Sequence, residues 1–87
     1  MPSLEITPLA QNKIQASGSG LVLRQLFDEI VKNPVEYTYG ESLSLRIYDG
    51  YYPPGPAPLS CKVIFSFDEK NDLVTIHDVE VSSPGIH

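Results

Sequence analysis

The chain has 87 residues, which is room for one small domain, and 41% of them are hydrophobic, as in ordinary globular proteins. No apolar run approaches the roughly 20 residues that a membrane-spanning helix needs, so we expect a soluble protein with no membrane contact. The net charge of −5 disfavours binding to RNA or a ribosome unless the few cations gather on one face.

Cysteine and histidine are scarce. Cys61 is the only cysteine, so no internal disulfide can form, and residues 1–5 lack the basic and apolar regions of a secretory signal. We therefore expect a reducing, cytoplasmic location. Two separated histidines and one cysteine make no zinc pattern, and the acidic turn 68–72 lacks the spacing of a calcium loop. We predict no metal and no cofactor.

The N-terminal part is predicted to form a strand and a helix. Apolar residues alternate with polar ones over Ser3–Thr7, which predicts a short strand. Thr7 followed by Pro8 favours a helix start, because threonine can cap a free backbone N–H and proline suits the first helical position. We expect this helix to end near Ala16, before the Gly/Ser-rich turn at 17–20.

A second helix is predicted over Leu21–Lys32. Five apolar residues recur there at helical spacing and define one buried side: Leu23, Leu26, Phe27, Ile30 and Val31. Asn33-Pro34 ends the helix, because a residue before proline avoids the α conformation. The two helices are therefore expected to form an αα-hairpin.

The C-terminal part is predicted to form three strands. Alternating apolar residues mark 43–48, 61–67 and 73–81 as strands. A connection with a turn at Gly40 precedes the first of them, and a proline-rich loop over 49–60 follows it. In the last strand, Val74 and Ile76 share one phase but Val79 and Val81 share the other, which predicts a β-bulge near His77-Asp78.

This order of elements resembles the RelE/ParE toxin superfamily over nearly the whole chain. The residues that carry the resemblance are Glu5–Ala10, Ile30–Pro34, Leu45–Gly50 and Cys61–Asp68. It implies a single α+β domain over 1–87, with a helical hairpin packed on one face of an antiparallel sheet of three to four strands. It also implies the toxin component of a toxin–antitoxin pair, bound to an antitoxin-like protein, and at most a ribosome-dependent or related mRNA endoribonuclease.

Three departures bear on activity. A proline loop is inserted between two strands, Glu80–Ser82 stands where the family's Gly-His-Arg would supply a cation, and the chain is acidic. Ribonuclease activity is therefore in question, and a non-catalytic interaction domain with the same fold is the alternative. An unrelated α+β domain with an accidental likeness is the third hypothesis, and the sequence leaves the oligomeric state open.

The resemblance implies three catalytic candidates. Arg46 and Lys62 are out of phase with the apolar residues of their strands, so both are expected on the sheet face away from the helices, where they could neutralise phosphate charge. The alternative is that both are solvated charges on an exposed sheet face, paired with Glu80 or Asp78. His87 lies near a family position for a terminal acid or base, although chain ends fray. His77 is expected to be structural.

The loop sequence Tyr51-Tyr52-Pro53-Pro54 is a candidate partner-binding segment. Prolines favour an extended polyproline conformation, and exposed tyrosines provide amphipathic contact area. The alternative is a stiff hairpin loop that folds over the open face of the sheet.

Overall fold

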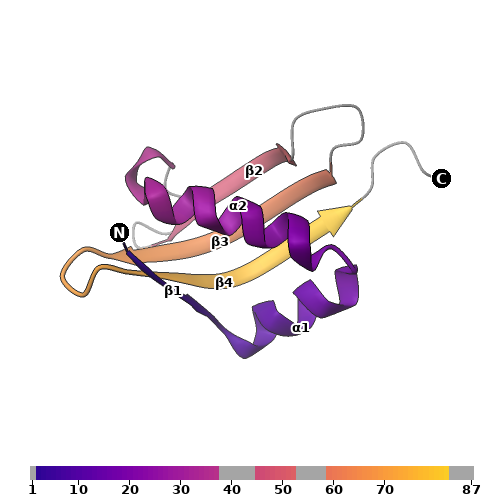
Figure 1. Ribbon diagram of the computed structural model, residues 1–87, viewed down its shortest axis with the longest axis horizontal. Helices are drawn as coiled ribbons and strands as arrows, with labels where there is room; N and C mark the ends of the chain where they lie inside the picture. Colours follow the sequence, from indigo (N-terminus) through magenta and orange to yellow (C-terminus); the bar gives the residue numbers. More distant parts are fainter. Residues whose placement is uncertain (1, 38–44, 53–58, 83–87) are drawn as a thin grey trace.

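A computed structural model describes residues 2–37, 45–52 and 59–82 (Figure 1). Its elements are, in chain order, β1 (Ser3–Ile6), α1 (Pro8–Ser17), α2 (Gly20–Lys32), a 3-10 helix (Pro34–Glu36), β2 (Arg46–Tyr52), β3 (Leu59–Asp68) and β4 (Leu73–Ser82). The α+β class and the β-α-α-β-β-β order confirm the sequence-based prediction. Neither α1 nor α2 is long and apolar enough to cross a membrane.

The four strands form one sheet in the order β1-β4-β3-β2. The pairs β2–β3 and β3–β4 are antiparallel, as predicted, but β1 pairs with β4 in parallel, so the sheet is mixed. The parallel pair is possible because the two helices carry the chain back from one end of the sheet to the other before β2 begins. The helix α2 lies across one face of the sheet, and α1 lies beside β4 (Figure 1).

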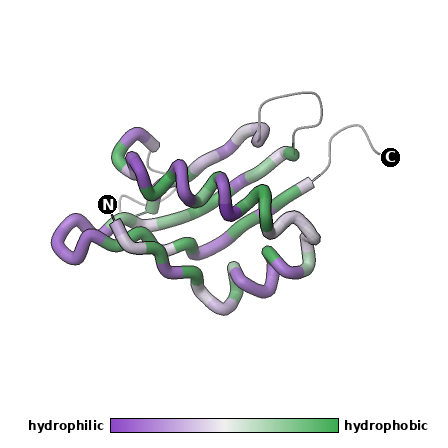
Figure 2. Tube along the Cα trace, in the orientation of Figure 1, coloured by the Kyte–Doolittle hydropathy of each residue, from purple (hydrophilic) through white to green (hydrophobic). Residues whose placement is uncertain are grey.

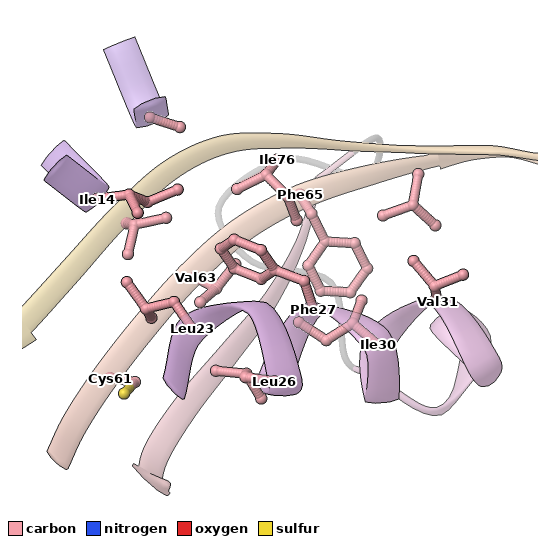
Figure 3. Close-up of a cluster of buried hydrophobic side chains, with 13 residues drawn as sticks. Ile14, Leu23, Leu26, Phe27, Ile30, Val31, Cys61, Val63, Phe65 and Ile76 are labelled. Atoms are coloured by element: carbon pink, nitrogen blue, oxygen red, sulfur yellow. The ribbon is translucent and has the colours of Figure 1, made fainter. Parts of the chain in front are cut away.

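The core lies between α2 and this face of the sheet. Leu23, Phe27 and Ile30 are at most 1% exposed, and they meet Val63 and Phe65 of β3, which are fully buried (Figure 3). Hydrophilic and hydrophobic residues alternate along α2 in Figure 2, as expected for a helix with one buried side. The predicted apolar side of α2 is therefore confirmed.

The predicted β-bulge is present in β4. Phe65 pairs with Ile76 and the preceding Ile64 pairs with Asp78, which leaves His77 as the extra residue. The bulge reverses the phase of the strand, so Ile76 before it and Val79 after it both reach the core, at 0% and 2% exposure.

The strand β2 differs from its predicted range. It spans Arg46–Tyr52, so the first four residues of the predicted loop 49–60 belong to a strand, and β3 already starts at Leu59. Tyr51 pairs with Ser60 and Tyr52 with Leu59, because aromatic residues suit a pleated, half-buried strand. Gly40, Leu43, Pro53 and Pro54 lie outside the described residues.

Candidate functional site on the open face of the sheet

The sheet face opposite α2, here called the open face, carries a row of three charged side chains. Asp49 of β2 pairs with Lys62 of β3, and Lys62 pairs with Glu80 of β4, so the three side chains lie side by side across the strands. This Asp49–Lys62–Glu80 row alternates acid, base, acid. Asp49 and Glu80 are exposed, and Lys62 is half-buried.

A shallow hollow of about 320 Å³ lies over this row. Its lining residues are Asp49, Ser60, Lys62, Glu80, Val81 and Ser82. Within the described part of the chain, no salt bridge shorter than 4 Å joins Lys62 to Asp49 or Glu80. Two carboxylates and two serine hydroxyls therefore surround one ammonium group, an arrangement that attracts cations more than phosphates.

Arg46 lies on the other face, so the predicted cation pair is not formed. Arg46 pairs with the buried Phe65, and its Nη1 donates a hydrogen bond to the carbonyl oxygen of Tyr37 at 2.8 Å. The Tyr37 ring contacts Phe65 edge-on, with ring centroids 5.6 Å apart, which places this group on the helix side. The prediction that Arg46 and Lys62 share the open face is therefore wrong.

The physical reason lies in the phase of β2. The residues of β2 that face the helices are Arg46, Tyr48, Gly50 and Tyr52, whereas Ile47 turns to the open face. The Tyr48 ring packs edge-on against Tyr37 at 6.0 Å, so an aromatic side chain serves the core better here than Ile47. Arg46 fits the helix face because its aliphatic stem can lie along apolar surface while its head finds a carbonyl.

The two tyrosines of the predicted partner-binding segment point to opposite faces. Tyr51 is 63% exposed on the open face, whereas Tyr52 packs against the core on the other face. Desolvation of Tyr52, together with the nearby Glu29 carboxylate, raises the pKa of this tyrosine. Of the two described residues of this candidate segment, Tyr51 alone has its side chain on the open face. Pro53, Pro54 and the third catalytic candidate, His87, lie outside the described ranges.

A second polar group surrounds the bulge and was missed by the sequence analysis. Ser66 Oγ lies 2.8 Å from His77 Nε2, and the hydroxyl of Thr7 donates to the carbonyl oxygen of His77 at 3.2 Å. The predicted phase break at His77 was the available signal, because bulges often aim a side chain at a neighbour.

A hydroxyl beside an imidazole is also the start of a nucleophile–base pair. Such a pair needs a third group that orients the imidazole, and no described side chain bonds His77 Nδ1. The Ser66–His77 hydrogen bond therefore links β3 to the bulge of β4, which agrees with the structural role expected for His77. Thr7 also caps α1 by accepting from Ala10 N at 3.3 Å, so it joins this helix to the bulge.

The bulge also presents Asp78 to α1. Lys13 Nζ lies 2.7 Å from Asp78 Oδ1, and both side chains are partly exposed. The hydrogen bond from Lys13 holds the pKa of Asp78 below its usual range, and the same bond raises the pKa of Lys13. The Lys13 ammonium group is therefore already paired within the chain, and it also acts on the nearby Glu80.

This ion pair predicts a pH dependence of stability. Because the pKa of Asp78 is lower in the folded chain, its stabilising contribution is present above the unfolded pKa and is lost as the pH falls through the folded value. The Lys13 contribution is lost at the alkaline end instead, as the pH rises through its raised pKa. Urea unfolding of Asp78→Asn at pH 7 and pH 3 should show a smaller acid loss than the parent chain. An equal acid loss in both proteins would contradict this origin.

Metal and thiol chemistry find no support here. In the part of the chain that the structure describes, no three His, Cys, Asp or Glu side chains gather in a way that could hold a metal ion. Cys61 is buried, and burial raises the pKa of its thiol, so it remains protonated and is a poor nucleophile.

Comparisons with known proteins show the fold. No protein-family model matches the chain, and no curated protein matches it in sequence. One chain of the crystal structure of the intact E. coli RelBE toxin–antitoxin complex is similar in structure, with a TM-score of 0.68 and 11% sequence identity. The similarity covers 91% of this chain and 94% of that chain. It supports the RelE-like fold that the sequence resemblance implies.

Proposed function

We propose that this chain is the toxin-fold component of a toxin–antitoxin type of pair, and that it works by binding a protein partner without cleaving RNA. The claim that the chain binds a protein partner rests on the fold, because the similar chain was crystallised in a toxin–antitoxin complex. The claim that it does not cleave RNA rests on one observation, the separation of Arg46 and Lys62 onto opposite faces of the sheet.

RNA cleavage needs several cations beside the scissile phosphate, because charge develops there in the transition state. In β2, β3 and β4 the only arginine and lysine are Arg46 and Lys62. Lys62 alone reaches the open face from these strands, and two carboxylates flank it. A phosphate at this position would meet more negative than positive charge.

The test combines three readouts. The chain is expressed in a bacterial host alone and together with the protein encoded by the neighbouring gene. We expect a complex that co-purifies, intact mRNA by primer extension, and growth arrest by the chain alone that acts through a target other than mRNA and is relieved by co-expression. New mRNA cuts that disappear in Lys62→Ala would overturn the claim that the chain does not cleave RNA. Failure to form any complex would overturn the claim that it binds a protein partner.

The alternative is a non-catalytic interaction domain outside any toxin pair. It shares the partner-binding surface and the charge pattern of the open face, so binding alone does not separate the two functions. Growth does separate them. A complex with the neighbouring gene product, together with normal growth when the chain is expressed alone, would favour the alternative.

A further inference from the structure

We infer that the Asp49–Lys62–Glu80 row binds a basic segment of the protein partner, whose lysine or arginine side chains pair with Asp49 and Glu80. This inference rests on the proposed function, because it specifies which surface the partner occupies. It is carried by the geometry and the charges of the open face.

The first observation is that no described element lies over the row itself, although Lys13 of α1 reaches Asp78 at the edge of the same face. Both helices pack their buried residues toward the opposite face, and within the described residues nothing lies over Asp49, Lys62 and Glu80. A shallow hollow lies over the row, and Ser60 and Ser82 also line it and offer neutral hydrogen-bonding groups. A partner segment can therefore reach the carboxylates without any rearrangement of the core.

The second observation is that the carboxylates are available. Asp78 is already paired with Lys13, whose charge also acts on the nearby Glu80, but no described cation lies within 4 Å of Asp49 or Glu80. The row keeps a surplus of one negative charge, in a chain whose net charge is −5. Charge complementarity therefore selects a basic occupant and disfavours RNA.

The third observation is spacing. Asp49 and Glu80 are separated by one intervening strand, which puts their backbones roughly 10 Å apart, since neighbouring strands lie about 4.8 Å apart. Two turns of a helix span this distance, so two basic side chains seven residues apart on one helical face could reach both carboxylates. Lys62 between them favours an acidic residue at the middle of the partner segment. The complementary pattern is base, acid, base.

The experiment measures the affinity of the neighbouring gene product by calorimetry at low and high salt. The test variant is Asp49→Lys with Glu80→Lys. The matched control is Glu36→Lys with Glu69→Lys, which changes the net charge equally at exposed sites away from the open face. We expect the dissociation constant of the test variant to rise about tenfold or more, and that of the control to change less than about threefold. Added salt should weaken the parent complex, whereas in the test variant it screens the new repulsion between lysines and the basic segment and should slightly strengthen binding.

Folding of each variant is checked by thermal melting. The variant Asp49→Asn with Glu80→Gln removes both negative charges without reversing them, and its loss of affinity should lie between those of the control and the test variant. Equal affinities for the parent, test and control chains would overturn this inference and leave the proposed function standing. No binding to the parent chain would overturn the proposed function and this inference with it. Binding of a short single-stranded RNA to the parent chain, abolished in Lys62→Ala, would assign the row to RNA and also overturn the inference.

Discussion

Replacing Phe65 with alanine is expected to lower the free energy of unfolding by about 3 to 5 kcal/mol. Phe65 is fully buried at the centre of β3, between Phe27 and the rest of the core, and its ring also receives the edge-on contact of Tyr37. The loss combines the transfer of the ring from water with the cavity that remains. A domain of this size has only about 5 to 10 kcal/mol of stability, so this one change removes a large part of it.

Urea unfolding followed by circular dichroism measures this loss. Ile64→Ala is the matched control, because Ile64 is the adjacent residue on the same strand and points to the open face. We expect it to cost about 1 kcal/mol or less. If Phe65→Ala leaves no folded protein, Phe65→Leu should remain folded with a loss of about 1 to 2 kcal/mol. A small loss in both Phe65 variants would contradict the packing described for β3.

The elements predicted most accurately are those with a long, one-sided pattern. The five apolar residues of α2 and the alternation of β3 leave only one way to bury a continuous apolar surface. The bulge at His77 could also be predicted, because one inserted residue lets a strand change phase while it stays paired with its neighbour. These are local patterns, and each is reinforced by the burial that it produces.

The phase of β2 could not be predicted in the same way. Ile47 is its one aliphatic residue, and its tyrosines can face either side of the sheet. The choice depends on the contacts of Tyr48 with Tyr37, a residue from another part of the chain. Because a shift of one residue sends every side chain to the opposite face, this single error moved Arg46 from the core side to the candidate site. The alignment of Asp49, Lys62 and Glu80 into one row depends on the pairing register of β2, β3 and β4, which the sequence pattern does not determine.

Deletion of His77 is expected to leave the fold intact, at a cost of about 1 to 3 kcal/mol. Without this residue Ile76 would be followed directly by Asp78, and their partners Phe65 and Ile64 are already adjacent in β3. Every other cross-strand pair of β4 can therefore remain in register. The cost arises from the lost hydrogen bonds to Ser66 and Thr7, each worth about 0.5 to 1.5 kcal/mol.

Deletion of Thr75 is the matched control, because it also removes one residue from β4, two positions away. It would place His77 opposite Phe65, where Ile76 now lies, and turn Ile76 to the open face. The lost burial of Ile76 and the buried imidazole together should cost about 4 kcal/mol or more, enough to unfold much of the protein. Thermal melting of the two deletions separates the cases. If both melt at the same temperature, His77 is not the residue that sets the phase of β4, and the buried positions of Val79 and Ile76 need another cause.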